Sequence, residues 1–370
     1  MASDLNNNAA KDLYILVDID GKGKGLLARI DIEPGTLIMA DTACLEIKHD
    51  FMLKERVARN MWSGWEMIVS WIEVILAVMI VILTYQSWPI VAGGLVLLGW
   101  QRISSHIVAT KSAILFQLSW KYLIKQIKSL NWDLITEFEI LQNVFPFTVA
   151  YQNWLGIFCT NSFQLDESDK SGLFLKVSRL NHSCRANCGY IIENGCIEVR
   201  TTRPVTAGEE LTICYNNFLE EDGPVVKSER KEYLHWAYRF SCQCEDCSLT
   251  GIMSRTNDHM RKKLVKLRKE WTITLDYKQE RQIVDEQIRL LLKLDSCGKT
   301  EYMLQAVECG WETEMNKREH MSNHGGEFDK KIDGERAAVL VELGRKLNKT
   351  FSGLNSQRSR EWEKRTQQLK

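Results

Sequence analysis

Short apolar runs separated by turn residues dominate two stretches of the chain. After a polar start, residues 1–11, which is expected to be disordered, "DLYILVDIDGKGKGLLARIDIEPGTLIMAD" alternates apolar runs with glycine-rich and Pro-Gly breaks. Such runs are typical of short strands joined by tight turns. The same character returns in residues 161–220, where "NGCIEVRTTRPVTAGEELTICYNNF" breaks at Asn-Gly and Ala-Gly-Glu. Residues 12–50 and 161–220 are therefore predicted to be the strand-rich parts of the chain.

An apolar insert, residues 51–104, separates these two parts. Within it, residues 67–100 carry Glu73 as their one ionisable carboxyl or amine. The run 68–85 is about long enough to cross a bilayer, and basic residues on both sides of residues 67–100 favour a hairpin with both ends in the cytoplasm. Three interpretations stay open: a membrane hairpin, a pair of buried core helices, or translated intron sequence.

Apolar residues at three-to-four-residue spacing mark the helical parts. Residues 105–160 show this spacing in "AILFQLSWKYLIKQI" and are predicted to be a helical insert. In "MRKKLVKLRKEW", Met260 and Leu264 fall on one face, and the charged residues around them are expected to form a solvated face. Residues 251–370 are thus predicted to be a C-terminal helical region, which makes the fold class α+β.

Charge and cysteine usage narrow the function classes. The chain has 48 Lys and Arg against 48 Asp and Glu, a net charge of zero. No global field therefore draws it to nucleic acid, and no direct nucleic-acid contact is predicted. Eleven cysteines in 370 residues are too few for a dense disulfide framework, and the opening "MASDLNNNAAKD" is too polar for a signal peptide. We expect a reducing intracellular compartment, nuclear or cytoplasmic, with membrane attachment if residues 67–100 form a hairpin.

Three thiols are concentrated in "FSCQCEDC", within residues 221–250. Cys242, Cys244 and Cys247 form a C-x-C-x2-C cluster, which is one ligand short of the closed tetrahedral shell of a structural zinc. Cys184 in "RLNHSCRANC" is the natural fourth ligand. A structural zinc would then fasten the tail of the domain to its middle, and the alternative is four free cysteines in a reducing cell.

Four motifs in a fixed order suggest a family. "GKGKGLLA", "NHSC", "GEELTICY" and the C-x-C-x2-C tail follow one another along the chain. Together they resemble a SET-domain protein-lysine methyltransferase, and "TNSF" with the three-cysteine tail brings the chain closest to the SMYD-like branch. The resemblance implies a SET β-fold of short sheets with a pseudoknot, and a zinc-bound post-SET segment over 221–250. It also implies S-adenosyl-L-methionine as cofactor and a lysine-containing protein substrate, histone or non-histone.

The resemblance assigns the cofactor contacts to three segments. Glycine suits one of them, because the main chain must approach a ligand closely there. Each segment also has a plain structural interpretation: a hairpin turn, a core histidine and a core phenylalanine. The assigned residues are Lys24, Gly25 and Leu26 at the methionine end of the cofactor, Asn181 and His182 on a threaded segment, and Phe240 against the adenine.

The resemblance implies that Tyr215 is the active-site tyrosine. Methyl transfer from a sulfonium needs a neutral amine and a straight approach in a narrow channel, and a tyrosine hydroxyl can orient the amine. Entry of the lysine into a low-dielectric channel favours its neutral form. The alternative for Tyr215 is a strand-end core residue. Asn161, Ser162 and Phe163 are expected to line the substrate cleft, although a loop entering a strand would have the same sequence character.

The chain departs from the SMYD-like pattern in one respect. Between Cys44 and Cys159 it has no cysteine, so the MYND zinc finger that such enzymes carry is absent, and the apolar insert occupies its place. This departure motivates a second hypothesis, a catalytically inactive SET scaffold, membrane-tethered if residues 67–100 form a hairpin, that binds partners through the C-terminal helices. Tight cofactor binding would distinguish the enzyme from the scaffold.

Overall fold

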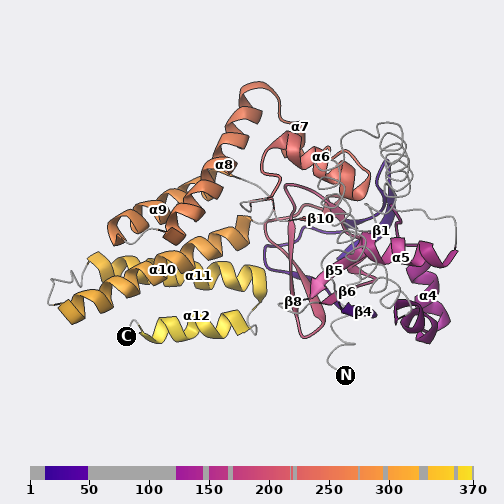
Figure 1. Cartoon of the computed structure of the whole chain (residues 1–370), viewed down its shortest axis with the longest axis horizontal. Coiled ribbons are helices and arrows are strands. Elements are labelled where there is room, and N and C mark those ends of the chain that lie inside the picture. Colours follow the sequence, from indigo (N-terminus) through magenta and orange to yellow (C-terminus); the bar gives the residue numbers. More distant parts are fainter. Residues whose placement is uncertain are drawn as a thin grey trace, which may run out of the picture. The chain divides into compact units, whose positions relative to one another are not determined.

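The described part of the chain combines short strands with long helices (Figure 1). The computed structural model describes residues 13–48, 122–144, 150–165, 170–216, 218–219, 223–273, 276–294, 299–324, 332–353 and 357–368. The predicted α+β class with short sheets and a C-terminal helical region is confirmed. The apolar insert predicted for 51–104 lies outside the described residues. No helix in the described ranges combines the length and the apolar character that a membrane crossing requires.

A four-stranded sheet brings the two strand-rich parts of the sequence together. Its strand order is β1-β2-β10-β7. β1 and β2 form an antiparallel hairpin, and β10 pairs antiparallel with β2 and parallel with β7. The parallel pairing places Asn181 opposite Thr212 and His182 opposite Ile213. The strands are Tyr14–Ile19 (β1), Gly23–Ala28 (β2), Asn181–His182 (β7) and Glu210–Ile213 (β10), with a 3-10 turn at Val177–Arg179 (η1).

A second, three-stranded antiparallel sheet has the strand order β3-β9-β8. Both sheets belong to one compact unit of the chain, which comprises residues 1–42 and 176–370. The predicted Asn-Gly break is the β8–β9 hairpin turn. Asn194 and Gly195 have φ angles of 53° and 73°, the left-handed pair that a tight two-residue hairpin requires. The strands are Leu37–Thr42 (β3), Cys188–Glu193 (β8) and Cys196–Thr201 (β9).

A second compact unit comprises residues 43–175. Its sheet has the order β4-β6-β5, and its core includes Leu45, Phe138, Phe158 and Leu173. Residues 122–129 are helical, so the described parts of the predicted helical insert are largely helical. The remaining elements are Leu45–Lys48 (β4), Trp132–Glu139 (α4), Ala150–Asn161 (α5), Ser162–Leu165 (β5) and Lys170–Leu173 (β6).

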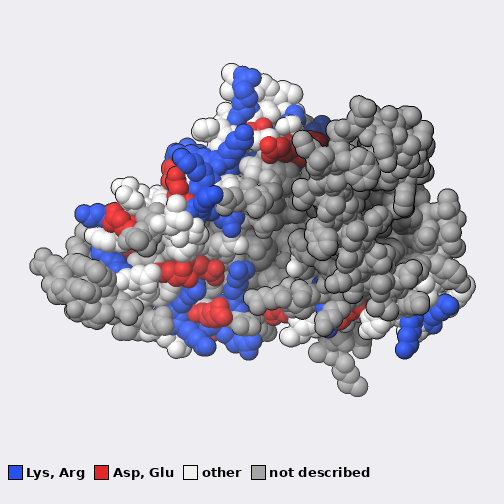
Figure 2. All heavy atoms as spheres, viewed as in Figure 1, with Lys and Arg blue, Asp and Glu red and all other residues white. Residues whose placement is uncertain are grey.

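Among the described residues, five helices form the C-terminal region, and each packs on the next one along the chain. Leu264, Leu290 and Leu291 belong to one buried cluster, and Trp311 and Trp362 to another. Basic and acidic side chains lie interspersed over these helices on the face shown in Figure 2, as expected for solvated helix faces. The helices are Gly251–Ile273 (α8), Tyr277–Lys293 (α9), Lys299–His324 (α10), Ile332–Ser352 (α11) and Gln357–Gln368 (α12).

Two elements connect the sheets to the C-terminal helices. α6 (Lys227–Tyr238) ends at Arg239, whose φ of 58° is left-handed, a common way to end a helix. The chain then turns toward Phe240 and the three-cysteine motif, and the short α7 (Glu245–Ser248) follows. The turn at Arg239 therefore directs the cysteine motif back toward Cys184, which follows β7.

Candidate functional site

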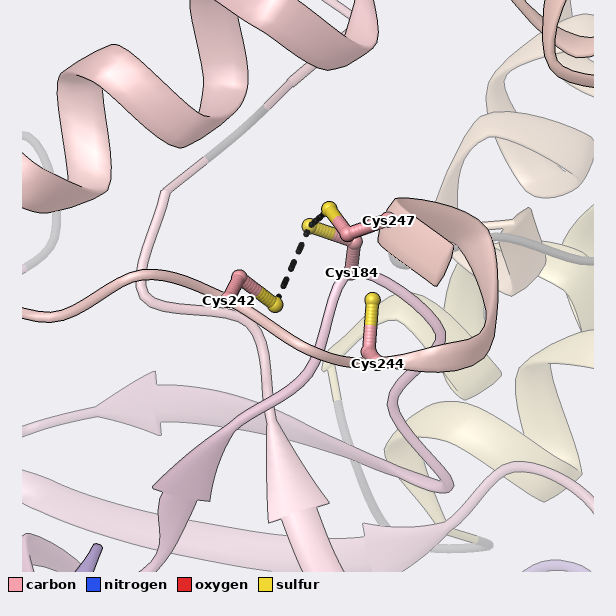
Figure 3. Close-up of side chains that lie close together, drawn as sticks. All are labelled: Cys184, Cys242, Cys244 and Cys247. Atoms are coloured by element: carbon pink, nitrogen blue, oxygen red, sulfur yellow. Dashed lines mark hydrogen bonds between the residues drawn. The ribbon is translucent and has the colours of Figure 1, made fainter. Parts of the chain in front are cut away.

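The four predicted cysteines converge on one point (Figure 3). Their sulfur atoms all lie within 4.8 Å of one another. The Cys184 sulfur is 4.0 Å from that of Cys242 and 3.6 Å from that of Cys247. Cys184 follows β7, Cys242 and Cys244 lie in the extended segment after α6, and Cys247 is on α7. Two parts of the chain that are distant in sequence thus contribute to one buried thiol cluster.

The spacing of these sulfurs suits a tetrahedral metal ion. With a zinc–sulfur bond of about 2.3 Å, the edges of a regular tetrahedron are about 3.8 Å long. The distances from the Cys184 sulfur to those of Cys247 and Cys242, 3.6 and 4.0 Å, bracket that length. Hydrogen bonding to the other sulfurs raises the pKa of Cys184 and lowers the pKa of Cys242. The cluster is therefore compatible with a structural zinc.

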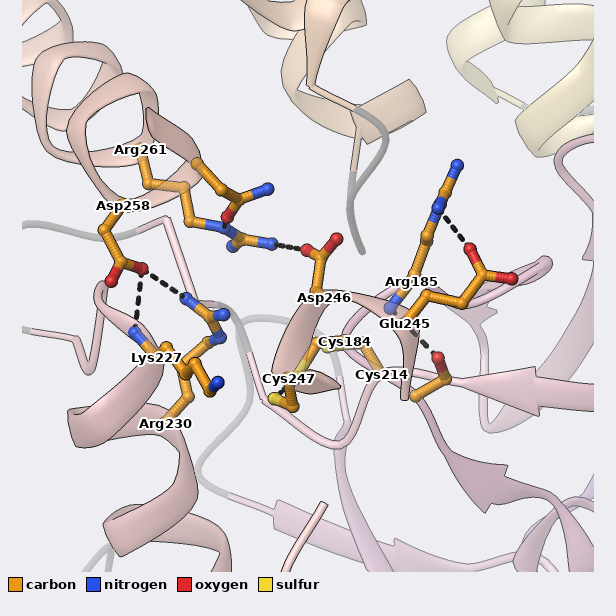
Figure 4. Close-up of polar contacts among 12 residues, drawn as sticks. Cys184, Arg185, Cys214, Lys227, Arg230, Glu245, Asp246, Cys247, Asp258 and Arg261 are labelled. Atoms are coloured by element: carbon orange, nitrogen blue, oxygen red, sulfur yellow. Dashed lines mark hydrogen bonds and ion pairs between the residues drawn. The ribbon is translucent and has the colours of Figure 1, made fainter. Parts of the chain in front are cut away.

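Two buried arginines accompany the thiol cluster (Figure 4). Arg230 and Arg261 are fully buried, and Arg261 is paired with Asp246 of α7. Burial opposes the charge of Arg230, but negative charge at Cys184 and Cys247 outweighs it and raises the pKa of the guanidinium. Two of its nitrogens, Nε and Nη2, are buried without a standard hydrogen-bond partner among the described residues. Such cations fit a site that carries excess negative charge, as four thiolates around one divalent ion would.

His182 lies between the thiol cluster and the end of β10. Only 6% of its surface is exposed. The backbone N–H of Tyr215 donates to its Nδ1 atom at 3.1 Å, and its Nε2 atom is 3.3 Å from the Cys184 sulfur. Burial lowers the pKa of His182, so the ring is neutral near physiological pH. The sequence already suggested that His182 combines a structural role with a site role, and these contacts define the structural part.

Tyr215 is attached at two points to the segment that carries His182. Besides the amide contact, its hydroxyl donates to the carbonyl oxygen of Leu180 at 2.9 Å. Burial raises the pKa of Tyr215 well above its usual value. The phenol therefore keeps its proton at physiological pH, and it can orient a neighbouring group but does not act as a base.

Asn181 connects β7 to the glycine-rich strand β2. Its side-chain amide donates to the carbonyl oxygen of Lys24 at 3.1 Å and to the carboxylate of Glu210 at 2.9 Å. A methyl group at Gly25 would lie 2.7 Å from the same amide nitrogen. Gly25 lies within β2, and its lack of a side chain leaves the room that the amide of Asn181 occupies.

The edge of β2 around Lys24 is only partly paired. β1 covers one side of the strand over its whole length. On the other side, the described register with β10 begins at Leu26, and Asn181 contacts the Lys24 carbonyl. Main-chain groups of Lys24 and Gly25 therefore lie next to a side-chain amide and not a full strand, an arrangement that suits a small polar ligand.

Aromatic rings surround His182 and Tyr215. The Phe240 ring centroid lies 5.9 Å from that of His182 and 6.4 Å from that of Tyr215. The sequence interpretation missed Phe218 and Tyr238, whose rings lie 5.6 Å from His182 and 4.9 Å from Tyr215. Phe218 follows Tyr215 closely in the sequence and Tyr238 precedes Phe240 closely. This proximity is the sequence signal that could have identified both residues.

The three predicted cleft residues belong to the other compact unit, residues 43–175. Asn161 ends α5, and its side-chain amide donates to the carbonyl oxygens of Gln142 and Ile157 at 2.8 and 2.7 Å. Ser162 and Phe163 begin β5, and the Phe163 ring packs edge-on against Phe174 at 5.7 Å. Their assignment to a substrate cleft stays a prediction.

Comparison with known sequences identifies the protein family to which this chain is similar. The SET domain family matches residues 23–216, more than half of the 370-residue chain. The matched range includes β2, the His182 segment, the first cysteine of the cluster and Tyr215.

Curated relatives match a smaller part of the chain. Histone-lysine N-methyltransferase SMYD3 of Mus musculus is 36% identical over 91 residues, which cover 24% of this chain and 20% of that protein. SMYD1 of Homo sapiens is 35% identical over 112 residues, covering 25% and 21%. Histone-lysine N-methyltransferase set5 of Schizosaccharomyces pombe is 30% identical over 128 residues, covering 34% and 38%. The match thus spans about a fifth of the SMYD relatives.

Among solved structures, the SET domain of LSMT bound to lysine and AdoHcy aligns with 99% of this chain and 91% of its own, at a TM-score of 0.31 and 15% identity. Family membership therefore rests on the sequence match, which covers the strands and the site segments described above. The chain belongs to the SET domain family.

Proposed function

We propose that this protein is an S-adenosyl-L-methionine-dependent protein-lysine N-methyltransferase of the SMYD-like branch. One observation carries the proposal: the segment 180–182 holds Tyr215 at its amide and its hydroxyl, and also contacts the backbone of β2. The named relatives, histone-lysine N-methyltransferases, support the same reaction class. The substrate would be a lysine side chain of a protein, histone or non-histone.

The cofactor would bind where β2, β7 and Phe240 meet. Bound S-adenosyl-L-methionine supplies a methyl group activated on a sulfonium sulfur. Main-chain groups of Lys24, Gly25 and Leu26 would hold its methionine end, because β2 is incompletely paired there. Asn181 and His182 would flank the cofactor, and the ring of Phe240 would stack on the adenine. These residues fit the ligand chemically: polar main chain for the amino acid, an aromatic face for the base.

Tyr215 would orient the lysine amine. Its hydroxyl donates its proton to the Leu180 carbonyl oxygen. The lone pairs of the Tyr215 oxygen therefore stay free to accept a hydrogen bond from another donor. That oxygen can accept a hydrogen bond from the amine or a weak C–H contact from the transferring methyl group. Removal from water in a low-dielectric channel would disfavour a charged ammonium and so favour the nucleophilic neutral amine. Alignment in a narrow channel then supplies most of the rate enhancement.

The four cysteines would hold a structural zinc. Four thiolates around one divalent ion carry a net charge of about −2, and the buried Arg230, on which the Cys184 and Cys247 sulfurs act, would offset part of it. The zinc would cross-link the Cys184 segment to the cysteine motif between α6 and α8 and supply folding energy to that connection. No protein ligand would be displaced during turnover, because the shell is complete.

Methylation of a protein extract with radiolabelled S-adenosyl-L-methionine tests this function. Native protein should label lysine residues, and Tyr215→Phe should lower the rate by about 100-fold, as expected for loss of one positioned hydroxyl. Tyr277→Phe, at the start of α9, is the matched control and should keep native activity. Unchanged labelling in Tyr215→Phe would remove that residue from its role. Zinc-loaded native protein without cofactor affinity would favour the inactive scaffold instead.

A further inference from the structure

The two ring nitrogens of His182 make contacts on opposite sides of the ring, and the direction of each hydrogen bond can be assigned. Its Nδ1 atom accepts the Tyr215 backbone N–H at 3.1 Å. A nitrogen that accepts a hydrogen bond carries no proton, and a neutral imidazole has one donor and one acceptor. The proton therefore resides on Nε2, which lies 3.3 Å from the Cys184 sulfur. His182 donates to the sulfur and accepts from the tyrosine.

The surroundings leave the His182 ring little freedom. β7 holds its backbone opposite Ile213 in the parallel pairing with β10. Phe218 contacts the ring edge-on at 5.6 Å, and Phe240 lies tilted at 5.9 Å. Because the ring is packed on these sides, a change in the position of the Cys184 sulfur cannot be absorbed by rotation of the ring alone.

We propose that His182 is a positioning residue that couples the metal centre to Tyr215 through the chain Cys184 sulfur, His182 imidazole and Tyr215 amide. The cysteine cluster then does more than fasten the tail of the domain. A metal-bound thiolate is a stronger hydrogen-bond acceptor than a thiol, so metal loading fixes the imidazole and, through it, the backbone of the tyrosine. The coupling itself does not need methyl transfer, whereas its effect on catalysis rests on the proposed function.

Two substitutions separate the two contacts of the imidazole. In His182→Asn, the amide oxygen reaches the position of Nδ1 but nothing reaches the sulfur. In His182→Gln, the amide nitrogen reaches the position of Nε2, while the Nδ1 acceptor is lost. We expect His182→Asn to weaken Co²⁺ affinity by about 10- to 100-fold, the usual cost of losing a partner of a metal ligand, and to shift the thiolate-to-cobalt absorption. His182→Gln should keep both near native.

The backbone amide of Tyr215 reports on the tyrosine end of the proposed coupling. Protein labelled with ¹⁵N-tyrosine gives this amide a resonance that is assigned by its loss in Tyr215→Phe. Exchange of zinc for the larger cadmium in the native protein should shift this resonance. In His182→Gln, the resonance should move upfield and its response to cadmium should disappear. His235→Asn and His235→Gln, on the exposed face of α6, are the controls and should match the native protein.

Failure of the coupling and failure of the proposed function are distinguishable. An unchanged Tyr215 resonance on exchange of zinc for cadmium in the native protein overturns the coupling, and this measurement needs no variant to fold. A response that persists in His182→Gln also overturns it. An intact response with no methylation of any protein would count against the enzyme activity alone.

Discussion

Replacing Gly25 with alanine tests the contact between β2 and Asn181. The new methyl group would overlap the Cδ1 atom of Ile19 and lie 2.7 Å from the side-chain nitrogen of Asn181. The Ile19 side chain is partly exposed and can rotate away. Asn181 is held by hydrogen bonds to the Lys24 carbonyl and to Glu210, so it can move only by breaking them.

The size of the effect follows from these contacts. Two hydrogen bonds at about 1 kcal/mol each give a loss of about 2 kcal/mol. If Asn181 must return to its native position to contact the cofactor, binding pays this cost, which corresponds to about 30-fold weaker binding of S-adenosyl-L-methionine. Overpacking at Gly25 should in addition destabilise the fold by about 1–3 kcal/mol.

Calorimetric titration with S-adenosyl-L-methionine and a thermal melt measure the two effects separately. The double variant Ile19→Val/Gly25→Ala removes the Cδ1 overlap but keeps the collision with Asn181. It should therefore recover part of the melting temperature and none of the cofactor affinity. Native affinity in Gly25→Ala would refute the assignment of Asn181 to the cofactor site, and a native melting temperature as well would refute the packing described for β2.

Three further predictions concern the metal cluster and the helices. Cys184→Ser should abolish stoichiometric zinc in elemental analysis, whereas Cys159→Ser, in the other compact unit, should retain it. Arg261→Met leaves the acidic partner on α7 buried without a countercharge and should cost about 3–5 kcal/mol in urea unfolding; a loss below about 1 kcal/mol would show that the ion pair is solvated. Hydrogen bonding from Arg289 lowers the pKa of Glu286 to about 2. The ionised Glu286 therefore stabilises the fold fully at pH values above the ordinary pKa of a glutamate, and this stabilisation is lost as the pH falls toward 2. Glu286→Gln should therefore lower the melting temperature at pH 7 by an amount worth up to about 1 kcal/mol, with no difference from native protein near pH 2.

The parts of the site that could be predicted are those with a local sequence signature. The C-x-C-x2-C spacing identifies three thiols, and the same reasoning names Cys184 as the fourth, because a tetrahedral shell must be closed. Glycine-rich and Asn-Gly breaks identify the hairpins, since left-handed backbone conformations demand these residues. The motif order around Tyr215 identifies the family that the comparison with known sequences confirms.

The parts that could not be predicted depend on partners from distant elements. Arg261 lies in a charged run that is expected to be a solvated face, yet it is fully buried. Its partner Asp246 precedes it in a different helix, and no helical periodicity reveals that pairing. The role of Asn181 at Gly25 likewise requires the parallel pairing of β7 with β10, a contact between segments that only the folded chain brings together.

The division of the thiol cluster between two sequence segments imposes an order on biosynthesis. Cys184 precedes Cys242 by 58 positions, so at translation rates of about 5–20 residues per second it is made about 3–12 seconds earlier. During that interval the nascent chain presents one of the four sulfurs without its companions. Ion capture must then await release of the later segment from the ribosome.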